Sequence, residues 1–299
     1  MERKIRMINV LHLGLSYRCN MACKHCFVTK KKDKLVEEDY YRIIDTLFEE
    51  GLFIIYYTFG EPLLSELFDK VSTYANKKGM VQILMTNGYL IDEGKIAILK
   101  KNHIQKVCIS IDHSESEMHD MNRNHKGAYV KALNAIKLLL DHGIHTEMSV
   151  TVNDNNVSCL EDIYHLGEEL NIEFISFLRE RKDGYLLELE KEEEYIRFFE
   201  KMAMKSEGVQ TLFHDMRLLP TLRRLKESGE INDSVYERYF EMNCCHSQYT
   251  LSIEPSGEVG RCNLRNDIIG KMLETSLKEI IGEGVDNCEG SICCTSISE

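Results

Sequence analysis

The chain has 299 residues, 43% of them hydrophobic, and this length suffices for one large α/β domain with an appendage or for two domains. Its 37 lysine and arginine residues against 49 aspartate and glutamate residues give a net charge of −12, which argues against binding to nucleic-acid phosphates or to anionic membranes. The sequence contains no uninterrupted apolar run of about 18 residues that would predict a membrane-spanning helix, and residues 1–15 lack the pattern of a signal peptide.

Cysteine is abundant, with eleven residues in the chain. A cysteine-rich sequence without a secretion signal is typical of metal binding in a reducing compartment. We therefore expect a cytoplasmic metalloprotein.

Apolar runs and helical periodicity alternate along the first 178 residues. The runs predicted as buried strands are residues 8–15, 53–58, 81–86, 107–111, 144–152 and 172–178. The segments predicted as helices between them are residues 36–51, 63–78, 92–101, 127–142 and 157–170. Such alternation predicts parallel βα units in a partial barrel, with ligands at the carboxyl ends of the strands.

Three cysteines follow the first predicted strand directly. Cys19, Cys23 and Cys26 have C-x3-C-x2-C spacing. An iron–sulfur cluster held by three thiolates keeps one iron with an open coordination position, where a small molecule can bind and receive an electron. A zinc site that also uses His25 is the competing interpretation, although His25 and Cys26 are adjacent and would strain the loop around one ion.

This motif resembles C-x3-C-x-aromatic-C, the signature of the radical S-adenosylmethionine (radical SAM) enzymes, with His25 in the aromatic position. The resemblance implies a partial (βα)6 TIM barrel and a [4Fe–4S] cluster whose open iron binds SAM. It further implies that reduction, by a flavodoxin- or ferredoxin-type electron donor, splits SAM into methionine and a 5′-deoxyadenosyl radical that abstracts hydrogen from a substrate.

Several motifs at predicted strand ends extend the resemblance. Phe59-Gly60-Glu61-Pro62 resembles the Gly-Gly-Glu-Pro motif that contacts the SAM amino group, with Phe59 in place of the first glycine. Thr86-Asn87-Gly88 resembles a Thr-Asn-Gly stretch beside the SAM site. Each of these segments would otherwise be an ordinary turn.

The later strands supply the remaining candidates. Ser110 and Asp112 end a strand that in the family lies near the ribose and methionine parts of SAM, and Arg123 belongs to a His-Asp-x-x-Arg stretch of the peptide-modifying branch. Val152 stands where the family packs an aliphatic side chain against adenine. The SAM-binding residues implied by the resemblance are therefore Gly60, Glu61, Asn87, Ser110, Asp112, Arg123 and Val152.

The chain beyond residue 178 loses the βα pattern and is predicted to be helical up to residue 239, with His214 and Asp215 on a helix surface. A hairpin is predicted from residues 249–254 and 258–261 around Pro255-Ser256-Gly257. Six cysteines crowd the last 56 residues, which indicates a small domain held together by metal. The predicted domains are residues 1–180 (barrel), 181–240 (helical linker) and 241–299 (cysteine-rich extension).

This extension resembles the opening of SPASM and twitch domains, which carry auxiliary iron–sulfur clusters. The resemblance implies one auxiliary [4Fe–4S] cluster, and zinc is the alternative. Cys244 could replace the first of its ligands and Cys293 the last. The implied ligands are Cys245, Cys262, Cys288 and Cys294.

The resemblance implies a peptide or protein substrate, with a maturase of ribosomally made peptides (RiPPs) as the first choice, forming a cross-link, a thioether or an epimer. A sulfatase-type maturase, a small-molecule radical SAM oxidoreductase and a non-catalytic iron–sulfur electron-transfer or scaffold protein are the alternatives. Only 18 residues precede Cys19, so either the barrel binds peptide directly or a separate protein binds its leader. Lys30-Lys31-Lys32 is predicted to be a solvated loop, or less favourably a docking site for an acidic electron donor or substrate segment.

Overall fold

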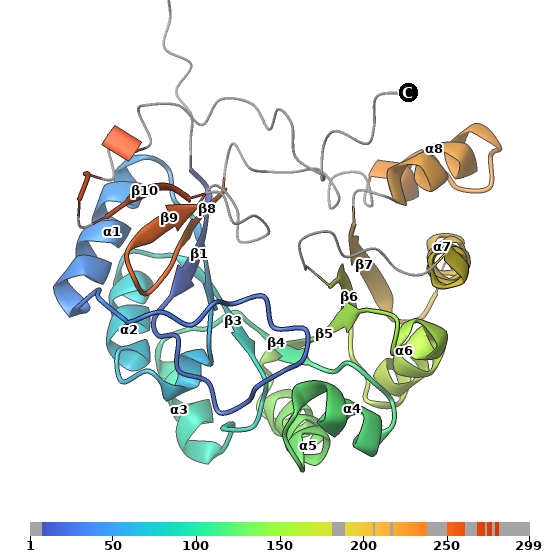
Figure 1. The fold of residues 1–299 in the computed structure, drawn as a ribbon, viewed down its shortest axis with the longest axis horizontal. Helices are drawn as coiled ribbons and strands as arrows, with labels where there is room; N and C mark the ends of the chain where they lie inside the picture. Colours follow the sequence, from blue (N-terminus) through green and yellow to red (C-terminus); the bar gives the residue numbers. More distant parts are fainter. Residues whose placement is uncertain are drawn as a thin grey trace, which may run out of the picture.

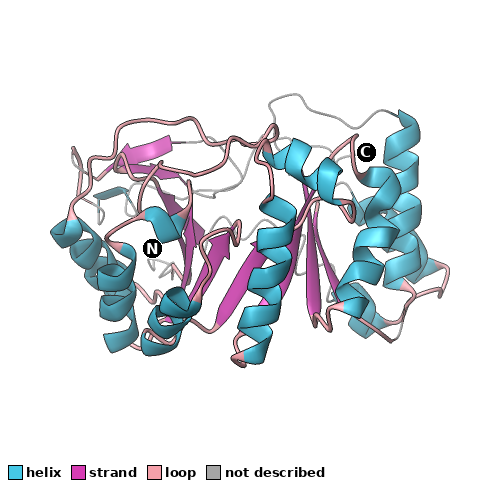
Figure 2. Ribbon diagram, turned by 90° about the horizontal axis from the view of Figure 1, so that it is seen from below, coloured by secondary structure: helices cyan, strands magenta, loops and turns pink. Residues whose placement is uncertain are grey.

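A computed structural model describes residues 8–180, 189–205, 207–215, 218–237, 250–260 and 268–280, with residues 273, 277 and 278 excepted. Its centre is a curved sheet in which the order of the strands is β10-β9-β8-β1-β2-β3-β4-β5-β6-β7. Figure 1 shows the strands as an arc with helices along its outer side. In Figure 2 the same helices cover the strands when seen from below.

Parallel pairing joins the strands from β1 to β7 in chain order. Their bounds are β1 (Val10–Gly14), β2 (Ile54–Thr58), β3 (Val81–Thr86), β4 (Lys106–Ser110), β5 (His145–Val152), β6 (Phe174–Arg179) and β7 (Gln210–His214). The helices are α1 (Glu37–Glu49), α2 (Phe68–Lys77), α3 (Glu93–Lys101), α4 (Ser116–Arg123), α5 (Ala128–Asp141), α6 (Leu160–Glu169), α7 (Leu189–Ala203) and α8 (Leu219–Glu227), with short 3-10 turns at Pro62–Leu64 and Val157–Cys159. The predicted α/β fold with parallel βα units is confirmed.

The local sequence explains these elements. Helix α1 begins with three acidic residues in its first turn, which suits the positive end of the helix dipole, and the side chain of Asp39 accepts a 3.0 Å hydrogen bond from the backbone N–H of Val36. Its buried face contains Tyr40, Ile43 and Leu47, spaced three and four residues apart. Burying such faces against the sheet produces one continuous apolar core.

The prediction of helix throughout residues 179–239 is wrong at β7, which pairs in parallel with β6. His214 is the last residue of this strand, and Asp215 is buried and ion-paired with Arg179, so neither lies on a helix surface. This contact joins the ends of β6 and β7.

The predicted hairpin is confirmed and forms part of the barrel sheet. Strand β8 (Thr250–Ile253) pairs in parallel with β1, while β9 (Glu258–Gly260) pairs antiparallel with β8 and β10 (Ile268–Lys271) antiparallel with β9. The hairpin therefore continues the sheet on the free side of β1. Among the described residues, no helix is long and apolar enough to cross a membrane.

Candidate active site

The loop between β1 and α1, residues 15–36, carries the three cysteines and is termed the cysteine loop here. Asp33 fixes its two arms to each other, because this carboxylate accepts hydrogen bonds from the Ser16 hydroxyl at 2.6 Å and from the Tyr17 backbone N–H at 2.9 Å. In its middle, the Lys24 N–H donates to the carbonyl of Asn122 in α4 at 3.0 Å. The loop thus extends from β1 to α4 along the carboxyl ends of the strands.

The thiols of the cysteine loop differ in exposure. Cys19 and Cys23 are half-buried, and Cys26 is exposed. Burial raises the pKa of the Cys19 and Cys23 thiols, since desolvation penalises the thiolate, while the nearby Arg123 guanidinium opposes this rise at Cys23. Burial thus favours the neutral thiols in the absence of a metal, and coordination to a metal would deprotonate them.

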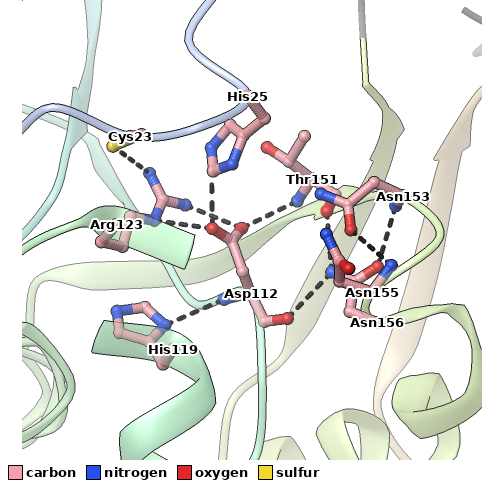
Figure 3. A network of polar contacts seen from close by, with 9 residues as sticks. All are labelled: Cys23, His25, Asp112, His119, Arg123, Thr151, Asn153, Asn155 and Asn156. Carbon is pink, nitrogen blue, oxygen red and sulfur yellow. Dashed lines mark hydrogen bonds and ion pairs between the residues drawn. The ribbon is translucent and has the colours of Figure 1, made fainter. Parts of the chain in front are cut away.

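Arg123 connects the cysteine loop to the end of β4. Its Nη1 lies 3.8 Å from the Cys23 sulfur, its Nη2 donates to Asp112 Oδ1 at 2.8 Å, and its Nε lies 2.7 Å from Asp112 Oδ2 (Figure 3). Both side chains are buried. Although burial acts to raise it, the pKa of Asp112 is held below its usual value by the charge of Arg123. The assignment of Arg123 to SAM binding stays a prediction, and here its guanidinium contacts Asp112.

Neighbouring backbone and side chains hold Asp112 in place. The Thr151 N–H donates to Asp112 Oδ1 at 3.1 Å, and the Asn156 side chain donates to the Asp112 carbonyl at 2.8 Å. The Asp112 N–H donates to Nδ1 of His119 at 3.1 Å (Figure 3). His25 lies on the opposite side, with its Nε2 at 3.6 Å from Asp112 Oδ2.

Asn156 and His119 were not among the residues predicted for the site. Asn156 is fully buried and joins β5 to β4, but an asparagine after a strand looks like a turn residue in the sequence. The recurrent His-Asp-x-x-Arg pattern was the available signal for His119, whose imidazole orients the backbone of Asp112.

Glu61 joins the ends of β2 and β3. Its carboxylate accepts a 2.7 Å hydrogen bond from the Thr86 hydroxyl and a 2.9 Å bond from the Asn87 N–H, and only 1% of the residue is exposed. Burial raises the pKa of Glu61 despite these donors. The Asn87 amide in turn donates to the side chain of Asn20 in the cysteine loop at 2.8 Å. The predicted SAM residues Glu61 and Asn87 are thus brought to the same rim as Cys19.

Gly60 lies directly under the cysteine loop. Its φ is +53°, and a β-carbon there would stand 2.5 Å from the carbonyl oxygens of both Ser16 and Arg18. The Glu61 N–H also donates to the Arg18 carbonyl at 2.8 Å. Phe59, at the position of the missing family glycine, adopts a φ of +60° despite its side chain. The sharp turn of the motif is therefore kept with phenylalanine present.

The remaining predicted site residues lie in different parts of the chain. Ser110 is half-buried at the end of β4, two residues before Asp112, whereas Val152 is fully buried in the core at the end of β5. Both stay predictions as SAM contacts. The predicted auxiliary ligands, Cys245, Cys262, Cys288 and Cys294, lie outside the described residues, as do Cys244 and Cys293.

The donor set of the cysteine loop fits an iron–sulfur cluster. Two buried donors, Asn20 Nδ2 in this loop and Asn122 Nδ2 in α4, have no hydrogen-bond partner among the described residues, as expected where another group completes the site. In the part of the chain that the structure describes, no three Cys, His, Asp or Glu side chains are grouped to hold a single ion. A [4Fe–4S] cluster binds each thiolate to a different iron, so Cys19, Cys23 and Cys26 can hold it without converging on one point.

Comparison with known proteins agrees with this geometry. Residues 13–167, more than half of the chain, match the radical SAM superfamily. The chain belongs to the radical SAM superfamily. This superfamily uses a [4Fe–4S] cluster and SAM, so these are the cofactors of this chain.

Two of the curated relatives have names that describe different products. The antilisterial bacteriocin subtilosin biosynthesis protein AlbA of Bacillus subtilis is 27% identical over 255 residues, covering 84% of this chain and 54% of AlbA. The Fe-coproporphyrin III synthase of Methanosarcina barkeri is 32% identical over 168 residues, covering 55% of this chain and 42% of that protein. The radical SAM chain thus spans about half the length of these relatives.

Solved structures share the fold. Streptococcus suis SuiB bound to its precursor peptide SuiA matches 92% of this chain and 65% of that chain with a TM-score of 0.74 at 16% identity. The protein anSMEcpe with bound AdoMet matches 91% of this chain and 79% of that chain with a TM-score of 0.68 at 19% identity. At these identities, the likeness establishes the fold of radical SAM enzymes for this chain.

Proposed function

We propose that this radical SAM protein is a maturase that abstracts a hydrogen atom from a peptide or protein side chain. When bound, the cluster and SAM supply a 5′-deoxyadenosyl radical for this step. The product would be a cross-link, a thioether or an epimer of a ribosomally made peptide.

The observation that carries the proposal is the extent of the match to AlbA. Its 255 aligned residues exceed the 155 residues of the superfamily match, 13–167, by 100. The matches to Fe-coproporphyrin III synthase and to an AdoMet-dependent heme synthase cover only 55% and 51% of the chain, which is about the length of the superfamily match. The similarity to AlbA therefore extends beyond the superfamily domain, and the name of AlbA concerns a bacteriocin, which is a peptide product.

The residues of this chain have separate tasks in the proposed reaction. Cys19, Cys23 and Cys26 would hold the cluster, and the buried pair of Arg123 and Asp112 would keep Cys23 in position. The surrounding barrel would exclude water from the reacting atoms, which prevents side reactions of a radical.

An auxiliary [4Fe–4S] cluster in the extension is part of the proposal, with Cys245, Cys262, Cys288 and Cys294 as its ligands. The hairpin of β8 and β9 supports it, since Cys262 follows β9 by two residues in the sequence. The hairpin also contacts the cysteine loop: the Lys34 N–H donates to the Pro255 carbonyl at 2.8 Å. The proposal also includes a separate protein that binds the leader segment of the precursor peptide.

The test is SAM cleavage in the presence of defined substrates. Anaerobically reconstituted protein is reduced with dithionite, and 5′-deoxyadenosine is quantified with SAM alone, with a precursor peptide encoded beside the gene, and with an iron tetrapyrrole. We expect cleavage that the peptide stimulates, together with a changed mass of the peptide. The Cys19/Cys23/Cys26→Ala variant is the matched control and should form no 5′-deoxyadenosine.

A second candidate is an enzyme that acts on an iron tetrapyrrole. Its support is that Fe-coproporphyrin III synthase is 32% identical to this chain over 168 residues and an AdoMet-dependent heme synthase is 31% identical over 156 residues. Stimulation by an iron tetrapyrrole with no change in the peptide would replace the maturase proposal by this one. Failure of the reduced wild-type protein to cleave SAM at all would contradict both.

A further inference from the structure

The cysteine loop is positively charged, although the chain as a whole is negatively charged. The chain carries a net charge of −12, whereas residues 17–34 contain six basic residues and one acidic residue, leaving five net positive charges. All six basic side chains are exposed: Arg18, Lys24, Lys30, Lys31, Lys32 and Lys34. Positive charge is thus concentrated on the segment that holds the cluster.

These charges line a groove at the surface. An open groove of about 590 Å³ is bounded by Tyr17, Arg18, Cys19, residues 30–33 and Leu64. Two of its charged groups are already paired: Asp33 accepts from Ser16 and Tyr17, and Lys31 pairs with Glu254 at 3.2 Å and with Glu258. These contacts fix the walls of the groove.

The other three cations have no such partner. Arg18, Lys30 and Lys32 form no ion pair and no side-chain hydrogen bond with any described residue. Their charges are therefore available to an approaching anion. The groove combines walls held by internal pairs with three unpaired positive charges.

The residues that line the groove include a predicted cluster ligand, Cys19, and no predicted SAM-binding residue. Cys26 on the same loop is exposed, and 39% of Phe27 is accessible. Among the described residues, this part of the cysteine loop is therefore accessible to another protein.

We propose that the groove formed by Arg18, Lys30 and Lys32 docks the acidic face of a small electron-carrier protein, which passes one electron to the cluster beside Cys19. The carrier is oxidised by one electron and the cluster is reduced by one, so the step balances. This inference rests on the proposed function, because only a redox-active cluster needs such a donor. Opposite charges on two proteins accelerate their association. Transient complexes of redox proteins bury little surface, so a groove of this size is sufficient.

A carrier fits better here than an acidic substrate peptide. An electron needs only a short path to the cluster, and Cys19 provides it in the wall of the groove. A substrate peptide must instead reach the carbon of SAM that carries the radical, on the side of Glu61, Asn87 and Asp112. None of those residues lines the groove.

The experiment compares two triple charge reversals of equal size. The groove variant is Arg18→Glu/Lys30→Glu/Lys32→Glu, and the control is Lys77→Glu/Lys126→Glu/Lys137→Glu, at exposed positions elsewhere on the barrel. Reduction of the reconstituted cluster is followed by anaerobic stopped-flow absorbance with reduced flavodoxin, a small acidic carrier, and separately with dithionite. We expect the groove variant to react at least about tenfold more slowly than the control with flavodoxin at low salt, and equally fast with dithionite.

The outcomes separate this inference from the proposed function. Equal flavodoxin rates in the two variants would overturn the docking site while SAM cleavage with dithionite continues. A raised KM for the substrate peptide in the groove variant, with unchanged flavodoxin rates, would assign the groove to the peptide instead. If dithionite gives no 5′-deoxyadenosine even in the wild type, the proposed function fails and the docking inference fails with it.

Discussion

Asp112 and Arg123 form a buried ion pair. Asp112 is fully buried, and its carboxylate contacts Arg123 through both oxygens. Because removing one partner of such a pair leaves an uncompensated buried charge, the pair is costly to break even where its net contribution to stability is small. Both partners act on the cysteine loop through Cys23.

We expect Asp112→Asn to lower the free energy of unfolding of the iron-free chain by about 3–5 kcal/mol, since the Arg123 charge is left buried without its counter-charge. The pKa of Asp112 is lowered in the folded state, so its ionisation stabilises the fold above the usual carboxyl pKa near about 4, and this contribution is lost as the pH falls below it. The wild type should therefore lose stability on acidification more steeply than Asp112→Asn. Urea midpoints measured between about pH 3 and pH 7 test this.

The control for this comparison is Glu115→Gln, at an exposed carboxylate three residues away. It should keep the pH dependence of the wild type. Equal acid-induced losses of stability in the wild type and in Asp112→Asn would show that Asp112 is not the group responsible.

For individual residues, the sequence predicted which ones lie near the site but not which contacts they make with one another. Asp112 and Arg123 were both assigned to SAM, because a motif conveys proximity to a site. Their mutual pairing depends on α4, which places Arg123 under the cysteine loop, and no element had been predicted there. The buried role of Asn156 depends likewise on the return of β5 beside β4.

Among the elements, those with a local signal were predicted and those fixed by distant pairing were not. Fully buried strands such as β3 and β5 show as apolar runs, and amphipathic helices such as α1 show their periodicity. Strand β7 has the sequence QTLFH, which is too short and too polar at its ends to be recognised. The hairpin was predicted from its turn, but its parallel pairing with β1 joins segments about 240 residues apart and leaves no local pattern.

The hairpin and the turn after β2 hold the cysteine loop from two sides. The Tyr17 hydroxyl contacts Glu254 and lies 2.9 Å from the Ser256 hydroxyl, while Gly60 packs against the backbone of residues 16–18. Tyr17 is buried, and burial together with Glu254 raises the pKa of its hydroxyl, which stays protonated. The geometry of the thiols therefore depends on elements distant in sequence.

We expect Gly60→Ala to displace the cysteine loop. The added β-carbon meets two carbonyl oxygens at 2.5 Å, whereas Gly127→Ala, at a φ of +81°, meets no atom within 4 Å. Both substitutions carry the left-handed backbone strain of about 1 kcal/mol, but only Gly60→Ala adds the clash, which should cost a further 1–3 kcal/mol or so. Thermal midpoints and bound iron after reconstitution measure the difference.

Iron content should fall in Gly60→Ala and stay at the wild-type level in Gly127→Ala. If both variants bind iron equally well, the close approach of Gly60 does not position the thiols. If both lose iron alike, the backbone conformation and not the contact is responsible.

At the scale of the whole molecule, one continuous sheet connects the two cysteine-rich regions. Strand β1 leads into the cysteine loop, and its neighbour β8 opens the hairpin that Cys262 follows in the sequence. The proposed auxiliary cluster would thus be attached to the element that contacts the cysteine loop through Glu254 and Pro255. The two sites would share a framework and differ in their ligands.

Counting iron separates the two sites. After anaerobic reconstitution, two [4Fe–4S] clusters correspond to about 8 Fe per chain, and removal of either ligand set should leave about 4. We therefore expect about 4 Fe both in Cys19/Cys23/Cys26→Ala and in Cys245/Cys262/Cys288/Cys294→Ala, with SAM cleavage lost only in the first. A wild type with about 4 Fe that falls to none in the first variant would restrict iron to the cysteine loop. Zinc analysis of the same samples would then decide whether the extension binds zinc, because four cysteines suit a structural zinc ion equally well.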